Sequence, residues 1–349
     1  MSRSVSVIIP TYNRAHFLSE AIESVLAQDI YSDDIEIIVV DDGSTDNTQD
    51  VVASFGDKIK YIYQTNQGAG RARNRGIEES TAEWIAFLDS DDRWLPDKLS
   101  LQFKVLEAFP DYRVIHSNFY TFEHDKVVIP KGLEYWVETA KGAGEVDWVE
   151  FYNKPFKSSD YSITQAGVPF DIYAGNLFRT FIEAPCAACW TLLVHRDCLN
   201  ESVRFAENYP ILEDWWFFCR LSENHDFLFM NCATAENRGH TGPRVSQIQR
   251  AKFLECYLDM CKQIYFPSAS PRRPTDEIIS KHYRIACTAL FKEYLKNGEL
   301  LRAKEFAKSV VEFNGFKSDS TLPLYRIAAF LPFDIIGRLV KLKKKVIGK

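Results

Sequence analysis

The chain has 349 residues, of which 46% are hydrophobic and 26% charged, a balance typical of a folded globular protein with one large domain or two merged domains. Its formal net charge of −6 argues against general nucleic-acid binding. No run reaches the roughly 18 apolar residues that a membrane-spanning helix needs. The apolar stretch from Val5 to Ile9 is too short for a signal peptide and is interrupted at Pro10.

The eight cysteines are scattered through the chain, which is typical of reduced thiols in a cytosol. Cys186 and Cys189 form one Cys-x-x-Cys pair, but no second pair has the spacing of a zinc ribbon, and Trp190 follows directly. Metal or redox chemistry at this pair is therefore disfavoured. We expect a cytoplasmic protein.

Four apolar stretches in the first quarter of the chain have the character of buried strands and alternate with helical patterns. They span residues 5–10, 35–40, 58–63 and 83–88. This alternation predicts βαβ units and a mostly parallel sheet. Ligands of such sheets bind outside the carboxyl ends of the strands, and polar residues follow all four stretches. The sequence therefore predicts an α/β fold with a ligand site at one edge of the sheet.

The fourth stretch ends in the acidic segment Asp89-Ser90-Asp91-Asp92. Two carboxylates held together at the end of a strand repel each other unless a cation lies between them. Mg2+ and Mn2+ prefer oxygen ligands of this kind, usually one or two carboxylates together with substrate phosphates. The segment thus predicts a metal-nucleotide site, and a solvated acidic turn is the alternative.

Four motifs follow these stretches in order: Pro-Thr-Tyr-Asn-Arg, Val-Asp-Asp-Gly-Ser-Thr-Asp, Asn-x-Gly-x-x-x-Ala-Arg-Asn-x-Gly and Asp-x-Asp-Asp. In this order and at these intervals they resemble the motifs of the family-2 inverting glycosyltransferases. The resemblance is close over residues 4–110 and looser to about residue 246. It implies the GT-A fold, a mixed, mostly parallel sheet flanked by helices, in which a nucleotide-binding half is merged with an acceptor-binding half. A Rossmann dehydrogenase is disfavoured, because Gly68-Ala69-Gly70 lacks the third glycine of that fingerprint and follows the third stretch.

The resemblance implies a metal site at the acidic segment. Asp91 would hold a Mn2+ or Mg2+ ion that neutralises the charge of the leaving diphosphate. Asp89 would bind a ribose hydroxyl or the outer shell of the metal. Which of the two carboxylates binds the metal directly stays open.

The same resemblance implies a nucleotide site next to the metal. The residues that would form the base pocket are Pro10, Thr11, Tyr12 and Arg14. Tyr12 would supply the stacking face, and Asp42 would accept a hydrogen bond from the base, as its family counterpart does with uracil. Arg71 and Arg75 would meet the diphosphate, because a guanidinium group matches phosphate oxygens.

Two further charged residues near this edge have structural interpretations. Arg73 is expected to pair with Glu78 or Glu79 on the same helix. Asp46 is either a ligand or the N-cap of the helix that follows it.

From residue 111 to about 246 the pattern changes, and we assign this part to the acceptor. Residues 114–122 and 126–129 are predicted strands. Residues 131–185 are predicted to form a long irregular insertion that contains the aromatic residues Trp136, Trp148, Tyr152, Tyr161 and Tyr173. Aromatic faces suit the C–H faces of sugars, so the insertion is a candidate acceptor pocket, with core packing as the alternative for most of these rings.

Glu213 and Asp214 precede an aromatic helical run and follow Pro210, so they fall in a first helical turn. Acids there favour the helix dipole, which is the structural interpretation. Family members carry a Glu-Asp pair at this point, and its aspartate serves as the catalytic base. Inversion needs a single displacement, with one base and no enzyme nucleophile. The resemblance therefore implies Asp214 as the base with Glu213 in support, and the reverse assignment is the alternative.

Residues 238–242, Arg-Gly-His-Thr-Gly, together with Ser246 resemble the family segment that closes over the diphosphate and metal. His240 is a candidate metal ligand or phosphate donor there. A structural histidine is the alternative.

The C-terminal third is predicted to be a helical extension, residues 247–315, followed by an amphipathic basic tail, residues 316–349. The helical patterns cover residues 247–264, 275–296 and 298–313. The basic residues near the end are Arg338, Lys341, Lys343, Lys344, Lys345 and Lys349, and no acid follows Asp334. Such a helix at an anionic membrane gains about 1 kcal/mol per Lys or Arg, and a solvated terminal helix is the alternative.

These features predict a metal-dependent, inverting glycosyltransferase with a nucleotide-sugar-binding half at residues 1–110 and an acceptor-binding half at residues 111–246. It would move a sugar from a nucleoside-diphosphate sugar, on family grounds a UDP-sugar, to a hydroxyl of a glycan or lipid-linked acceptor. It would act in the cytoplasm, or peripherally at the inner face of the membrane. A non-catalytic sugar-nucleotide-binding scaffold of a polysaccharide assembly complex is the alternative, but it would need no second carboxylate pair. A glycoside hydrolase also uses two carboxylates but needs no nucleotide-binding edge.

Overall fold

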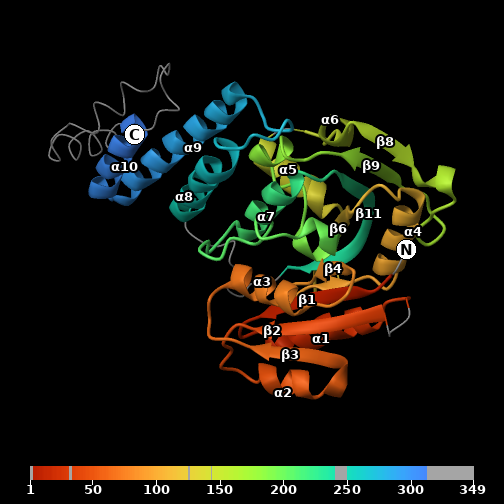
Figure 1. Ribbon diagram of the computed structural model, residues 1–349. Coiled ribbons are helices and arrows are strands. Elements are labelled where there is room, and N and C mark those ends of the chain that lie inside the picture. The colour runs from red at the N-terminus through yellow and green to blue at the C-terminus, as the bar shows by residue number, and fades with distance from the viewer. Residues whose placement is uncertain (1–2, 31–33, 125, 143, 240–249, 313–349) are drawn as a thin grey trace. The chain divides into compact units, whose positions relative to one another are not determined.

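The computed structural model describes residues 3–30, 34–124, 126–142, 144–239 and 250–312. The chain divides into two compact units, one comprising residues up to 243 with residues 270–273, the other residues 244–269 and those from 274 on. Figure 1 shows both units coloured along the chain. His240, Ser246 and the basic tail lie outside the described residues.

The described strands of the first unit form one mixed sheet. Their bounds are β1 (Val5–Thr11), β2 (Ile35–Asp41), β3 (Ile59–Tyr63), β4 (Trp84–Phe87), β5 (Arg93–Trp94), β6 (Val114–Glu123), β7 (Lys126–Ile129), β8 (Lys154–Lys157), β9 (Asp171–Gly175), β10 (Leu193–His195) and β11 (Phe227–Arg238). The order across the sheet is β3-β2-β1-β4-β10-β6-β11-β9-β8, while β5 pairs with β11 and β7 with β6. Strands β3, β2, β1 and β4 run parallel, as do β6 and β11, and the other pairs are antiparallel. The predicted mixed α/β sheet flanked by helices is confirmed. The described strands are not mostly parallel, because parallel pairing is concentrated in the first half and the later strands pair mainly antiparallel.

The helices of the first unit flank this sheet (Figure 1). Their bounds are α1 (Ala15–Leu26), α2 (Thr48–Ala53), α3 (Ala69–Glu79), α4 (Lys98–Ala108), α5 (Gly132–Lys141), α6 (Trp148–Tyr152) and α7 (Glu213–Ser222). Helix α3 packs on the β1–β2 part of the sheet, where Ala72 meets Ile38 and Val40. A Cβ atom on Gly76 would lie 2.3 Å from Cγ2 of Ile8, so only glycine allows α3 to approach this closely.

Strand β1 continues one residue past Pro10, where the sequence suggested an interruption. Its pairing with β4 ends at Ile8, whose partner is Phe87. The carbonyl of Ile8 accepts a hydrogen bond from the N–H of Leu88, which follows β4. The backbone nitrogen of Pro10, two residues farther along β1, faces the same side of the strand. Because β4 has ended there, the missing N–H of proline costs the sheet no hydrogen bond.

The expectation of an irregular insertion at residues 131–185 is wrong. This segment contains α5, α6, β8 and β9, and β9 pairs with β11, so the insertion extends the sheet. The elements have only four to ten residues each, too few to show a clear period in the sequence. Trp148 and Tyr152 are buried against Phe229, with ring centroids 4.6 and 5.5 Å from it, so these two rings belong to the core.

The second unit is helical, with α8 (Arg250–Met260), a π-helical turn at Cys261–Tyr265, α9 (Asp276–Asn297) and α10 (Leu300–Glu312). Both α8 and α10 pack against α9. Thr275 caps α9 through its side chain, and Gly298 ends the helix at φ 78°, in the left-handed region. The helical extension is thus present over the described residues. In that part of the chain no helix is both long and apolar enough to cross a membrane.

Candidate active site

The carboxyl ends of β1, β2 and β4 lie next to one another, as the sequence predicted. Thr11 ends β1 directly opposite Asp41, the last residue of β2. Strand β4 pairs with β1 on its other side, and the acidic segment follows β4. Residues from three separate motifs therefore meet at one edge of the sheet.

The predicted base pocket at this edge combines an exposed ring with a buried hydroxyl. The Tyr12 side chain is 48% exposed, so its face is open to a ligand. Thr11 is buried, and its Oγ1 has no hydrogen-bond partner among the described residues. Buried hydroxyl groups are normally satisfied, so this one marks a place that a ligand could complete.

Asp42 is buried and holds the loop that follows β3. Its Oδ1 accepts hydrogen bonds from the backbone N–H of Gln67 at 2.9 Å and from the side chain of Gln64 at 2.7 Å. Its Oδ2 accepts one from the backbone N–H of Gly68 at 2.8 Å. Asp42 therefore positions the entry to α3, and its bond to a base stays a prediction.

Asp46 accepts hydrogen bonds at the first residues of two helices, which agrees with a structural role rather than with the role of a ligand. Its Oδ2 accepts a hydrogen bond from the N–H of Ala15, the first residue of α1, at 3.1 Å. Its Oδ1 accepts bonds from the N–H and hydroxyl of Thr48, the first residue of α2. These bonds outweigh burial and lower the pKa of Asp46.

Arg73 is the centre of a buried ion-pair cluster, and its expected pairing within α3 is wrong. Its Nη2 lies 2.8 Å from Oδ1 of Asp89, and its Nη1 lies 2.9 Å from Oε1 of Glu213. Burial alone would lower the pKa of the guanidinium, but Asp89 above all holds that pKa well above its usual value. Arg73 thus joins the acidic segment to the first residue of α7.

The two arginines predicted to bind the diphosphate form ion pairs with nearby glutamates. Arg71 pairs with Glu78 at 2.8 Å and with Glu207 at 3.3 Å. Arg75 pairs with Glu79 at 2.7 Å. Their contact with a diphosphate stays a prediction.

The glycine-rich start of α3 is explained by close packing. A Cβ atom on Gly70 would lie 2.6 Å from the carbonyl oxygen of Ala206. Asn74 holds the same loop, because its side chain exchanges two hydrogen bonds of 2.9 Å with the backbone of Phe205. The ring of Phe205 in turn stacks on Phe217 of α7, with centroids 4.2 Å apart. Helix α3 therefore positions the loop that leads to Glu213 and Asp214.

The three carboxylates of the acidic segment have different surroundings. Asp91 is 25% exposed, and its Oδ2 lies 3.7 Å from Nε of Arg14. Asp89 is held by Arg73, yet burial and the charge of Asp91 raise its pKa. Asp92 is buried and accepts a hydrogen bond from the backbone N–H of Arg238 at 2.8 Å. Burial, followed by the charges of Asp91 and Asp89, raises the pKa of Asp92 well above its usual value.

This surplus of negative charge fits a divalent cation. Asp91, 25% exposed at this edge, is the carboxylate predicted to bind one, and Asp89 lies beside it. No group of three or more His, Cys, Asp or Glu side chains could hold a metal ion in the part of the chain that the structure describes. Mg2+ is commonly held by one or two carboxylates plus substrate phosphates, and Asp91 with Asp89 is such a partial set.

The predicted base lies in the first turn of α7. Leu212 precedes the helix at φ 68°, a strained conformation for a branched residue. Asp214 is half-buried, and its Oδ1 accepts a hydrogen bond from the N–H of Trp215 at 2.7 Å. Burial, and after it the charge of Glu213, raises the pKa of Asp214 to about 7. A carboxyl group with this pKa is suited to accept a proton near neutral pH.

The chain was compared with known proteins. The sequence model of Glycosyl transferase family 2 matches residues 6–183, more than half of the chain. An uncharacterised glycosyltransferase of Nostoc sp. (strain PCC 7120) is 50% identical over 115 residues, which cover 32% of this chain and 34% of that protein. The Escherichia coli protein UDP-Glc:alpha-D-GlcNAc-diphosphoundecaprenol beta-1,3-glucosyltransferase WfgD is 38% identical over 141 residues, 38% of this chain and 53% of that protein. The chain thus aligns with between a third and about half of the length of these relatives.

Solved structures resemble the whole chain. S. aureus TarS 1-349 in complex with UDP has a TM-score of 0.59 at 18% identity, over 99% of this chain and 92% of that one. The mannosyltransferase PcManGT of Pyrobaculum calidifontis, in complex with GDP-Man and Mn2+, has a TM-score of 0.50 at 18% identity, over 93% and 85%. The likeness shows a shared fold, and the predicted GT-A fold is confirmed. Together with the family match over residues 6–183, it establishes that the chain belongs to glycosyltransferase family 2.

Proposed function

We propose that this protein is a metal-dependent, inverting glycosyltransferase that moves a sugar from a nucleoside-diphosphate sugar to a hydroxyl of a glycan or lipid-linked acceptor. The observation that carries the proposal is the buried Arg73, which holds Asp89 of the acidic segment and Glu213 beside the base. Arg73 thereby connects the acidic segment, which we propose to bind the cation of the diphosphate, with the helix turn that carries the proposed base. Such an arrangement supports sugar transfer more than it supports a non-catalytic sugar-nucleotide-binding scaffold.

In this mechanism Asp214 accepts the proton of the acceptor hydroxyl as that oxygen attacks the anomeric carbon, and the bond from this carbon to the diphosphate breaks, so that the nucleoside diphosphate leaves. A single displacement inverts the configuration and needs no enzyme nucleophile. Asp91, with Asp89 beside it, would hold the cation, which when bound neutralises the charge that develops on the diphosphate. Tyr12 and Thr11 would receive the base.

The relatives support a nucleotide-sugar donor. TarS has been solved with UDP and with UDP-GlcNAc, and PcManGT with GDP-Man and Mn2+. The name of WfgD specifies a UDP-Glc donor and a diphosphoundecaprenol-linked acceptor. We therefore propose a UDP-sugar as the donor and Mn2+ or Mg2+ as the metal.

Binding of UDP is expected to depend on the metal and on Asp91. In the presence of Mn2+, UDP at 100 times its dissociation constant should stabilise the protein by about 2.7 kcal/mol, and EDTA should abolish most of this effect. Asp91→Asn should bind UDP in Mn2+ no better than the parent does in EDTA. Thermal unfolding and calorimetry measure both quantities. Equal affinity of the parent in Mn2+ and in EDTA would count against the metal site.

The basic C-terminal tail, which lies outside the described residues, is proposed to hold the enzyme at anionic membranes. Deleting residues 338–349 should release the protein from liposomes that contain phosphatidylserine, because each Lys or Arg near the surface contributes about 1 kcal/mol. Co-sedimentation at low and high salt measures the binding. The proposal fails if the full chain ignores such liposomes at low salt.

A further inference from the structure

Helix α1 presents a row of side chains to the segment that follows the acidic residues. The members of this α1 row, at the helix and directly after it, are Phe17, Glu20, Ser24 and Gln28. Their spacing of three or four residues places them along one face. Ser24 Oγ accepts a hydrogen bond from the N–H of Trp94 at 3.1 Å, and the Gln28 side chain donates one to the carbonyl of Leu95 at 2.7 Å. The α1 row therefore fixes the backbone that leaves the acidic segment.

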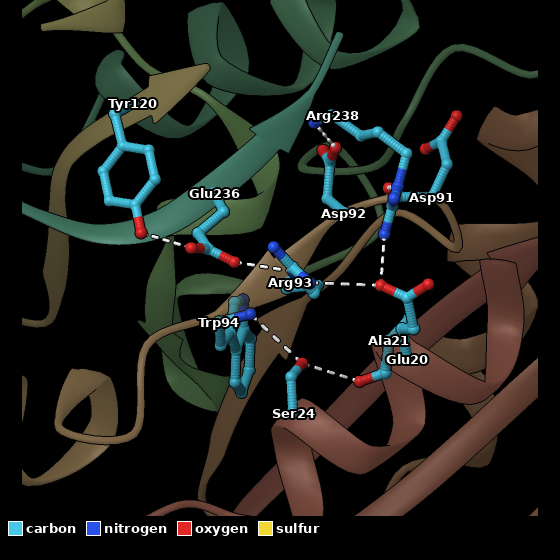
Figure 2. A network of polar contacts seen from close by, with 10 residues as sticks. All are labelled: Glu20, Ala21, Ser24, Asp91, Asp92, Arg93, Trp94, Tyr120, Glu236 and Arg238. Carbon is cyan, nitrogen blue, oxygen red and sulfur yellow. Dashed lines mark hydrogen bonds and ion pairs between the residues drawn. The ribbon is translucent and has the colours of Figure 1, made fainter. Parts of the chain in front are cut away.

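Glu20 holds two arginines from different strands within this row. Its Oε2 accepts hydrogen bonds from Nη1 of Arg93 at 3.2 Å and from Nη2 of Arg238, as Figure 2 shows. Arg93 directly follows the acidic segment, and Arg238 ends β11. Both guanidinium groups also lie near the ring of Phe122, at 4.1 and 4.8 Å from its centroid. One carboxylate thus brings together two cations that would otherwise repel each other.

Arg238 connects Glu20 to the acidic segment. Its Nε donates a hydrogen bond to the backbone carbonyl of Asp91 at 3.0 Å, and its own N–H donates one to Asp92 (Figure 2). The ring of Phe17 lies under its guanidinium, 4.7 Å away. Arg238 therefore holds the backbone of Asp91 by its carbonyl group.

We propose that Glu20 is a positioning residue of the donor site, which acts through Arg238 and Arg93 on the orientation of Asp91. Glu20 holds the two guanidinium groups in place, and the hydrogen bond from Arg238 then sets the backbone on which Asp91 is presented. The inference rests on the proposed function of Asp91 as a metal ligand.

The test uses the full-length protein with UDP and Mn2+ as probes. Glu20→Ala is expected to raise the Mn2+ concentration that half-saturates UDP binding by about 10-fold, the lower end of what residues behind a metal ligand contribute. Affinity for UDP at saturating Mn2+ should stay near that of the parent. Glu20→Gln keeps an acceptor oxygen and should lose less. Glu23→Ala, an exposed position on the same helix, is the matched control and should leave the Mn2+ requirement unchanged.

A double-mutant cycle separates positioning from a merely structural role. If Glu20 acts through Arg238, Glu20→Ala combined with Arg238→Met should shift the Mn2+ requirement little beyond Arg238→Met alone. A structural role would lower the melting temperature without moving the Mn2+ requirement, and this result would overturn the inference. A parent protein that binds UDP without regard to Mn2+ would overturn the proposed metal site as well. If the parent needs Mn2+ to bind UDP and Glu20→Ala has the same Mn2+ requirement as Glu23→Ala, the role of Glu20 is overturned and the proposed metal site stands.

Discussion

Replacing Asp214 with Asn is expected to lower sugar transfer by about 10²–10⁴-fold, the usual contribution of a general base, while donor binding stays at the parental level. An acceptor hydroxyl is too weak an acid to ionise by itself, so the base matters only as the proton leaves in the transition state. The loss should therefore appear in kcat as much as in kcat/KM. Steady-state kinetics of transfer and calorimetry of UDP binding in Mn2+ measure the two effects separately.

The pH dependence of the parent should agree with this role. The pKa of Asp214 is raised to about 7, so transfer should increase as pH rises through 7 and the carboxylate forms. The same shift means that the protonated form favours folding at low pH and that this contribution is lost as pH rises to 7. Asn cannot ionise, so Asp214→Asn should melt no lower than the parent above pH 7. Loss of fold would then be excluded as the reason for lost transfer.

Glu213→Gln is the control for the assignment within the pair. Because Glu213 contacts Arg73, its loss should affect stability more than the Asp214 change does. If Glu213→Gln removes only transfer while Asp214→Asn abolishes donor binding, the two roles are exchanged. If neither change affects transfer, the base lies elsewhere.

Replacing Arg73 with Met is expected to reduce the free energy of unfolding by about 3–5 kcal/mol, because removing one partner of a buried ion pair leaves uncompensated buried charge. Two acids are affected here, since Arg73 contacts both Asp89 and Glu213. Urea denaturation of the protein without ligands measures the change.

Arg75→Met on the same helix is the matched control for Arg73. Its side chain is 41% exposed and pairs with Glu79, so the loss should be less than about 1 kcal/mol. Equal losses in the two variants would show that the Arg73 cluster contributes no more than a surface pair. A loss at Arg73 that disappears in the variant Asp89→Asn/Glu213→Gln would confirm that the two unpaired acids cause it.

The sequence was sufficient to predict the parallel strands and the edge at which their polar ends meet. Each strand of residues 1–90 is a mainly apolar run with a turn signal at or near its end, and this pattern is local. The positions of Thr11, Asp42 and Asp91 follow from it, because parallel strands bring their carboxyl ends to one edge. The placement of Asp214 in a first helical turn also followed from local pattern.

The partners of Arg73 and Asp92 could not be predicted in this way. Arg73 meets Glu213 across 140 positions, and Asp92 meets Arg238 across 146. The nearer acids Glu78 and Glu79 stand five and six positions from Arg73, which is not the three- or four-residue spacing of neighbours on a helix face. Burial of α3 against the loop at Phe205 turns Arg73 toward the distant acids instead. The elements of residues 131–185 were missed because each is short and packs on other parts of the fold, β9 on β11 and α5 on β6, without a clear period in its sequence.

Strand β10 covers the edge of the parallel part of the sheet, although it lies far along the chain from β4. The match to the family model ends at residue 183, before Leu193, yet β10 lies between β4 and β6 and hydrogen-bonds to both. Without residues 193–195, β4 would present a row of unpaired N–H and C=O groups, a template for association with other chains. The segment that carries the four sequence motifs therefore has its β4 edge covered only after the chain returns to it more than a hundred residues later.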